Sequence, residues 1–181
     1  VFISGAGSNL NNLIKFKKKK NSKFKIEMII SNNSLAKGLN YAKKYKIYKK
    51  VVNYKNIITA EKQILITLNK RKIHLICLAG YMKILSINFI KKFNGKIINI
   101  HPSLLPKYKG LNTHKRAIDN NERYAGCTVH YVNSKLDSGK VILQKKIKIL
   151  KKDTVKILSQ KVLTQEHLLY PRALKKILTN L

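Results

Sequence analysis

One stretch organises the chain: Asn99-Ile100-His101-Pro102-Ser103-Leu104-Leu105-Pro106. Alternation along a strand places Asn99 and His101 on the same face, and Pro102 ends the strand because proline cannot donate to the ladder. In open α/β sheets ligands bind at the carboxyl ends of the strands, so an amide and an imidazole there indicate chemistry on a carbonyl group. Two solvated polar residues at a strand end fit the same spacing equally well, so this stretch alone leaves both interpretations open.

Apolar runs alternate with helical patterns along the whole chain. Strands are predicted at residues 1–3, 26–30, 47–52, 73–80, 96–101, 125–133 and 141–149. Helices are predicted from Leu10, through residues 39–43, 60–71, 86–90 and 113–118, and from Asp153 onward with an interruption at Tyr170-Pro171. This order of elements predicts an α/β fold with a mostly parallel sheet.

The 181 residues contain no linker rich in Pro, Gly or Ser, which predicts a single domain over residues 1–181. Because the chain opens at Val1 within a strand, that strand is expected to lack a few residues. Cys77 and Cys127 lie in apolar runs, which is typical of buried, reduced thiols in a cytoplasmic protein. No apolar run reaches the roughly 18 residues that span a bilayer, so no membrane partner is expected.

The formal net charge of +32 is typical of proteins that bind nucleic acid, and a non-catalytic RNA-binding protein is one interpretation of the chain. However, only four of the 39 basic residues are Arg, and the dense run at residues 17–20 follows a predicted helix, where cations complement the helix dipole. We therefore expect no specific nucleic-acid partner. A positive field of this kind would still attract substrates that carry phosphate or several carboxylates.

A glycine turn, Gly5-Ala6-Gly7-Ser8-Asn9, separates the first strand from the first helix. Such a turn offers backbone N–H groups and the positive end of the helix dipole to an anion. The third glycine of a dinucleotide fingerprint is absent, and no Gly-Lys-Ser/Thr follows as in a P-loop. An anion site and an ordinary capped helix start both fit this turn.

Several further motifs follow the central stretch in a fixed order: Tyr108-Lys109-Gly110, Val129-His130-Tyr131-Val132 and Lys135-Leu136-Asp137-Ser138-Gly139. Together they resemble the folate-dependent formyltransferase family, and the resemblance covers nearly the whole chain. The segments Ile3-Ser4-Gly5-Ala6-Gly7-Ser8-Asn9-Leu10 and Thr164-Gln165-Glu166-His167 are similar to the members that formylate glycinamide ribonucleotide. The resemblance implies a twisted sheet of about seven strands with helices on both faces.

The resemblance implies that a formyl group passes from 10-formyltetrahydrofolate to the amine of glycinamide ribonucleotide in purine biosynthesis, with no metal. The catalytic residues would be Asn99, His101 and Asp137. Asn99 and His101 would donate to the negative charge that develops on oxygen, and Asp137 would keep the imidazole protonated or oriented. Without the resemblance, an aspartate in such a turn most often caps its own backbone.

The resemblance also implies the binding residues. Gly7, Ser8 and Asn9 would hold the phosphate of the ribonucleotide, and Glu166 its sugar, although a solvated helix carboxylate is the alternative for Glu166. The folate would contact the segment Tyr81-Met82-Lys83-Ile84-Leu85 together with Asn99. Lys83 stands where family members often carry Arg.

A formyltransferase that acts on methionyl-tRNA is the nearest rival within the family. The glycine turn and Glu166 count against it, and we expect no C-terminal domain that could bind tRNA. We expect a cytoplasmic enzyme that acts on small-molecule substrates as a monomer or a homodimer.

Overall fold

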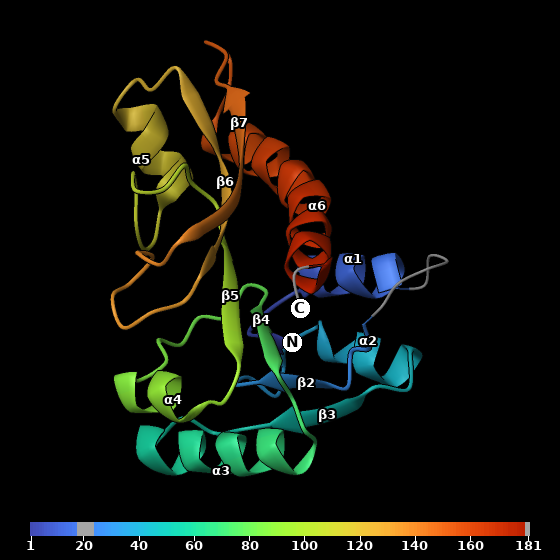
Figure 1. Ribbon diagram of the computed structural model, residues 1–181. Helices are drawn as coiled ribbons and strands as arrows, with labels where there is room; N and C mark the ends of the chain where they lie inside the picture. The colour runs from blue at the N-terminus through green and yellow to red at the C-terminus, as the bar shows by residue number, and fades with distance from the viewer. Residues whose placement is uncertain (18–23, 180–181) are drawn as a thin grey trace. The chain divides into compact units, whose positions relative to one another are not determined.

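The computed structural model describes residues 1–17 and 24–179 (Figure 1). It is an α/β structure whose seven strands form one mostly parallel sheet in the order β3-β2-β1-β4-β5-β6-β7. The predicted fold class and strand number are therefore confirmed. The contacts within the chain divide it into two compact units, Val1–Ile98 and Asn99–Leu181.

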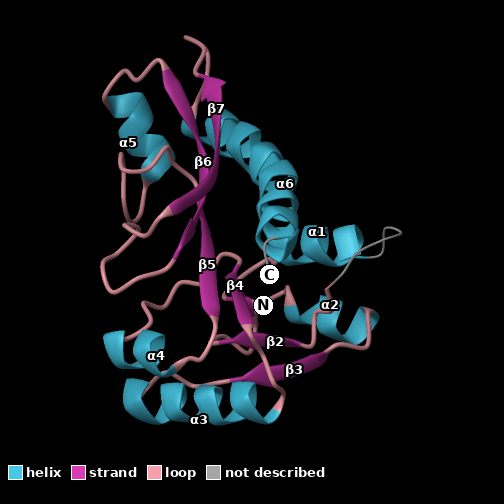
Figure 2. Cartoon of the chain, in the orientation of Figure 1, coloured by secondary structure: helices cyan, strands magenta, loops and turns pink. Residues whose placement is uncertain are grey.

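The first unit contains four short parallel strands: β1 (Phe2–Ile3), β2 (Met28–Ser31), β3 (Tyr48–Val51) and β4 (Leu75–Leu78). Its helices are α1 (Ser8–Lys17), α2 (Leu39–Lys44), α3 (Ile57–Lys70) and α4 (Ile87–Lys92). Figure 2 shows α1 and α2 on one face of these strands and α3 and α4 on the other. Because β1 has β2 on one side and β4 on the other, the strand order reverses at β1. Such a reversal opens a crevice at the carboxyl ends of the strands, where α/β proteins bind ligands.

The second unit begins within β5 (Lys96–His101) and contains α5 (Thr113–Asp119), β6 (Tyr124–Tyr131), β7 (Val141–Lys148) and α6 (Val155–Thr179). Strands β6 and β7 are antiparallel, and their register shifts between Val129 and His130. The long helix α6 packs along both of these strands (Figure 1).

Local sequence explains where most elements begin. The side chain of Asn56 accepts from Thr59 N at 3.0 Å, so α3 begins at Ile57, three residues before the predicted start. Ser86 caps α4 as predicted, since its Oγ accepts from Phe89 N at 3.0 Å. Strand β2 begins two residues later and ends one residue later than predicted, and β4 lacks two of the predicted residues at each end, because the apolar runs extend beyond the paired residues.

Helix α6 runs without a break through Pro171, so the predicted interruption at Tyr170-Pro171 is wrong. A proline inside a helix removes one backbone hydrogen bond. Here Tyr170 and Ala173 are fully buried and Leu174 is 2% exposed, so the packing of this face outweighs the lost hydrogen bond.

Cys77 and Cys127 are buried and free, as predicted. Among the described residues, no helix is both long enough and apolar enough to cross a membrane. Lys17 ends α1, and the remainder of the lysine run at residues 18–20 lies outside the described residues.

Candidate active site

The second unit brings Asn99, His101 and Asp137 into one cluster, which also includes His130. Asn99 and His101 come from β5, His130 from β6, and Asp137 from the turn before β7. His101 Nδ1 lies 3.3 Å from Asp137 Oδ2, and their side chains are only 7% and 9% exposed. His130 Nε2 lies 3.6 Å from Asp137 Oδ1 and 3.3 Å from Asn99 Nδ2.

The imidazole of His101 has one committed nitrogen and one that faces the carboxylate. Its Nε2 lies 2.9 Å from the carbonyl oxygen of Tyr108, and since a carbonyl only accepts, Nε2 carries a proton. Nδ1 therefore remains as the edge that faces Asp137, and it can donate to the carboxylate or to a substrate oxygen only when the imidazole carries a second proton. If His101 donates to a substrate, as predicted, it must do so from Nδ1, because Nε2 already donates to Tyr108.

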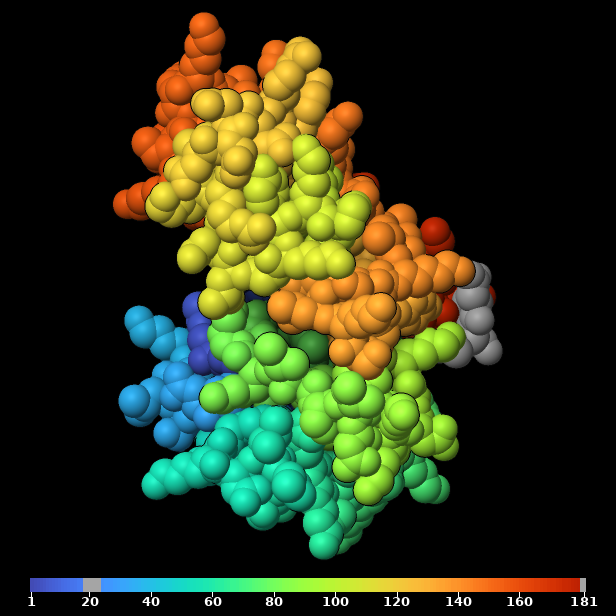
Figure 3. Space-filling model, turned by 90° about the vertical axis from the view of Figure 1, so that its left-hand side faces the viewer, coloured from blue at the N-terminus to red at the C-terminus, as the bar shows by residue number. Residues whose placement is uncertain are grey.

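Close backbone contacts hold Asp137 in its position beside His101. The residue has a φ of 45°, and its Oδ2 accepts from Gly110 N at 2.9 Å. A Cβ on Gly139 would lie 1.7 Å from the carbonyl oxygen of Tyr131, so only glycine lets this turn approach the end of β6. Figure 3 shows the turn before β7, in orange, beside the yellow-green segment that precedes α5, and the 2.6 Å contact between Lys109 Nζ and Ser138 Oγ joins the two.

His130 is the member of the cluster that the sequence analysis missed. Its Nδ1 lies 2.8 Å from the carbonyl oxygen of Tyr131, so Nδ1 carries a proton and Nε2 accepts from the Asn99 amide. Burial lowers the pKa of His130, which favours this neutral form. A histidine near the end of a mostly apolar strand was the available signal.

The buried neutral imidazoles predict a loss of stability in mild acid. Burial lowers the pKa of both His130 and His114. In mild acid, the unfolded chain therefore binds protons at these two imidazoles, whereas the folded chain does not. The free energy of unfolding should therefore be highest above about pH 6.5 and fall below it, by up to about 1.4 kcal/mol per pH unit for each proton. Urea denaturation between about pH 5 and about pH 8 measures this slope.

The variant His130→Gln, which cannot titrate, should have a shallower slope than the unmodified chain. His74→Gln is the matched control, since His74 is exposed beside β4. Equal slopes for the His130→Gln variant and the unmodified chain would contradict the assignment of His130 as a neutral buried imidazole.

The glycine turn lies in the first unit and differs slightly from the prediction. Helix α1 begins at Ser8, so Ser8 and Asn9 occupy its first turn, where backbone N–H groups have no partner within the helix. Gly7 has a φ of 72°, and a Cβ there would lie 2.7 Å from Gly38 Cα. Gly5, by contrast, is exposed, with no atom near the position of a Cβ. The close approach of the turn to Gly38 therefore requires glycine at position 7 but not at position 5.

The segment at residues 81–85 follows β4 and belongs to the same unit as the glycine turn. Met82 and Ile84 are 66% and 70% exposed, whereas Leu85 is 6% exposed and belongs to the core. The hydroxyl of Ser4 accepts from Met82 N at 2.7 Å and so ties the segment to the end of β1. The segment thus presents two exposed apolar side chains on an anchored backbone.

Tyr81 faces inward. Its ring packs edge-on against Phe2 and Tyr54, with centroids 5.3 and 6.2 Å apart, and burial raises the pKa of its hydroxyl. Five residues of this segment were predicted to contact folate. Two of them, Tyr81 and Leu85, pack into the interior and so support the segment. Lys83 is exposed.

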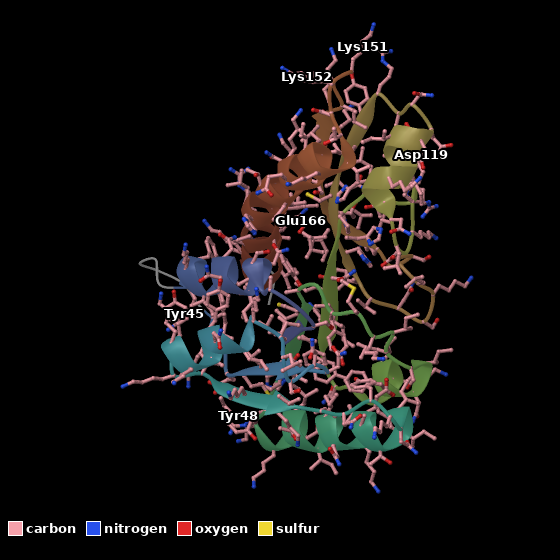
Figure 4. The ribbon with its side chains drawn as sticks, turned by 180° about the vertical axis from the view of Figure 1, so that it is seen from behind. Tyr45, Tyr48, Asp119, Lys151, Lys152 and Glu166 are labelled. Carbon is pink, nitrogen blue, oxygen red and sulfur yellow. The ribbon has the colours of Figure 1, made fainter. Side chains whose placement is uncertain are left out.

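Glu166 lies on α6 in the second unit and is 8% exposed (Figure 4). The alternative that it is a solvated helix carboxylate is therefore wrong. Its negative charge is close enough to Cys127 to oppose ionisation of that thiol, although burial is the larger cause of the rise in the pKa of Cys127 to about 12. Cys127 thus stays a neutral thiol at neutral pH and is no nucleophile. Among residues 1–17 and 24–179, no three His, Cys, Asp or Glu side chains are grouped so as to hold a metal ion.

Comparison with known proteins identifies the family. The sequence profile of the formyl transferase family matches residues 1–174. The phosphoribosylglycinamide formyltransferase of Haemophilus influenzae is 42% identical over 178 residues, which are 97% of this chain and 84% of that protein. The trifunctional purine biosynthetic protein adenosine-3 of Homo sapiens is 42% identical over 180 residues, and the chain spans only 18% of its length.

A solved structure agrees with this assignment. The crystal structure of the phosphoribosylglycinamide formyltransferase from Anaplasma phagocytophilum superposes with a TM-score of 0.93 at 41% identity. The match covers 99% of this chain and 85% of that one. The chain therefore belongs to the formyl transferase family.

Proposed function

We propose that the chain transfers the formyl group of 10-formyltetrahydrofolate to the amine of glycinamide ribonucleotide, in purine biosynthesis. The observation that carries this proposal is the buried cluster in which His101 Nδ1 faces Asp137 and Asn99 is held by His130. The cluster offers hydrogen-bond donors and a carboxylate, which suits a reaction whose nucleophile is the amine of a substrate. Similarity to the Haemophilus influenzae enzyme along 97% of the chain supports the same reaction.

The cluster would act on charge and protons. When bound, the formyl folate supplies the carbonyl group that the amine attacks. Asn99 keeps one N–H of its amide for the formyl oxygen, since the other donates to His130 Nε2. His101 donates from Nδ1 to the charge that develops on that oxygen, and Asp137 balances the charge of the imidazolium. The carboxylate of Asp137 also receives the proton that the amine loses, directly or through a water molecule, and this proton passes to the folate nitrogen as the bond between that nitrogen and the formyl carbon breaks.

The remaining predicted residues are proposed to bind the substrates. The backbone N–H groups of Gly7, Ser8 and Asn9 would hold the phosphate at the start of α1. The carboxylate of Glu166 would accept from the sugar hydroxyls. The folate would contact the exposed side chains of the segment after β4, and the ionised carboxylates of its tail suit the basic surface.

An assay of the purified chain with both substrates tests the proposed reaction. Formylated glycinamide ribonucleotide should appear in the mass spectrum only when formyl folate is present. Replacing the ribonucleotide with methionyl-tRNA in the same assay tests the rival within the family. Formylation of the tRNA while the ribonucleotide stays unmodified would overturn the proposal.

The phosphate site has its own test in Ser8→Ala, which removes a hydroxyl at the first position of α1. A lost hydrogen bond to a charged group should raise the KM for the ribonucleotide roughly tenfold and leave the KM for folate within about twofold. Gly7→Val is unsuitable, because its side chain would collide with Gly38 and strain the backbone. Ser159→Ala on α6 is the control, and an unchanged KM for the ribonucleotide in Ser8→Ala would remove Ser8 from the phosphate site.

We also propose that the basic charge serves no specific nucleic-acid partner. Lysines occupy the last turns of α1, α2 and α4, where they complement the helix dipoles. This distribution spreads the charge over many elements. The proposal includes a cytoplasmic location, which the two free thiols support, and a monomer or homodimer as the working state.

A further inference from the structure

Residues 107–112, here called the strap, connect the central stretch to α5 and have an unusual backbone. Tyr108, Gly110 and Asn112 have φ angles of 55°, 76° and 57°. Glycine adopts this left-handed region freely, but a bulky residue such as tyrosine rarely does. The surroundings of Tyr108 must therefore hold it there.

Two backbone groups of the strap touch the proposed catalytic pair. The carbonyl oxygen of Tyr108 accepts from His101 Nε2 at 2.9 Å, and Gly110 N donates to Asp137 Oδ2 at 2.9 Å. The first contact fixes a proton on Nε2 of the imidazole, which leaves Nδ1 facing the carboxylate. The second holds the carboxylate itself. A shift of the strap would therefore disturb both partners at once.

Side chains remote from the cluster hold the strap from outside. Glu122, which follows α5, accepts from Tyr108 Oη at 2.9 Å and from Lys107 Nζ at 2.7 Å, and its side chain is 22% exposed. Arg116 Nη1 donates to the carbonyl oxygen of Lys109 at 2.7 Å, and its guanidinium lies 5.0 Å from the centre of the Tyr108 ring. The hydrogen bonds from Lys107 and Tyr108 lower the pKa of Glu122, so this carboxylate is ionised at neutral pH.

We propose that Glu122 and Arg116 are positioning residues that keep Tyr108 in its left-handed conformation, so that its carbonyl selects the proton position on His101. They act through the strap and touch no reacting atom. The kinetic part of this inference rests on the proposed function, whereas the effect on the imidazole does not. A purely stabilising role would lower the melting temperature and leave the proton on Nε2 of His101.

The experiment compares three variants of the full chain. Tyr108→Phe removes only the hydrogen bond to Glu122, and Glu122→Ala removes the carboxylate. Asp119→Ala is the matched control, because Asp119 on α5 (Figure 4) forms a similar ion pair with Lys115 at 2.6 Å and is 51% exposed. Nitrogen NMR of the labelled imidazoles reports which nitrogen carries the proton, and His101→Gln identifies the signals of His101.

In Tyr108→Phe and Glu122→Ala, we expect the fraction of the neutral His101 imidazole that carries its proton on Nε2 to fall. We also expect kcat to drop about 3- to 10-fold, the effect of one hydrogen bond, with KM within about twofold. Asp119→Ala should match the unmodified chain in both readouts. Glu122→Gln keeps an acceptor for Tyr108 Oη, so it should recover most of the kcat and of the Nε2 protonation that Glu122→Ala loses. If Glu122→Ala does not fold, Glu122→Gln takes its place.

Unchanged His101 signals in Tyr108→Phe and in the Glu122 variants would overturn the inference, even if their melting temperatures fell. Absence of formyl transfer by the unmodified chain would instead contradict the proposed function. The imidazole signals would still decide the inference in that case, because they need no substrate.

Discussion

Replacing His101 with alanine is expected to lower kcat for formyl transfer on the order of 100- to 1,000-fold, or about 3 to 4 kcal/mol of transition-state stabilisation. The side chain is buried, so its Nδ1 donor acts where water does not screen the charge on the formyl oxygen. KM for either substrate should change much less, since this donor matters mainly after the charge has developed. Single-turnover formyl transfer measures the chemical step directly.

His74→Ala provides the control for His101→Ala. His74 is an exposed histidine beside β4 in the first unit. The control should transfer formyl groups at the rate of the unmodified chain. If the His101→Ala variant kept more than about a tenth of that rate, His101 would not be a principal donor to the oxyanion.

The fold could be predicted because its pattern is local. An apolar run predicted β5 and Pro102 its end, and Ser86 predicted the start of α4. Where the predicted helix boundaries were wrong, the physical cause is one that the periodicity of apolar residues does not reveal. Asn56 starts α3 early by capping, and burial of Tyr170 keeps α6 helical across Pro171.

The site could be predicted only in part. Alternation placed Asn99 and His101 together, but nothing in their spacing points to Asp137, which the resemblance to formyltransferases supplied. Its contact with His101 depends on the left-handed backbone at Asp137 and on the missing side chain of Gly139, two features of the folded turn. His130 was missed because a single histidine in a strand does not reveal its partners on neighbouring elements.

The burial of Glu166 could have been predicted from the sequence. Leu158, Val162, Glu166 and Leu169 follow the spacing of one helix face, and all four are buried. A carboxylate on such a stripe is costly unless the fold gives it a partner. The spacing thus distinguishes Glu166 from a solvated helix residue, although it does not show what the carboxylate binds.

Replacing Asp137 with asparagine should cost kcat at least as much as His101→Ala, on the order of 100- to 1,000-fold or more. The variant keeps the shape of the side chain and removes the charge that balances an imidazolium 3.3 Å away. Because Asp137 works through His101, the double variant His101→Ala, Asp137→Asn should lose far less than the product of the two single losses.

A second cycle, His130→Ala with Asp137→Asn, distinguishes coupling to His101 from general disturbance around Asp137. His130 lies 3.6 Å from the same carboxylate, but its pKa is lowered by burial and its Nε2 accepts from Asn99, so it holds no charge for Asp137 to balance. Its coupling to Asp137 should therefore be much smaller than that of His101. Purely multiplicative losses in the His101 cycle would show that Asp137 acts independently of His101, and the paired mechanism would have to be abandoned.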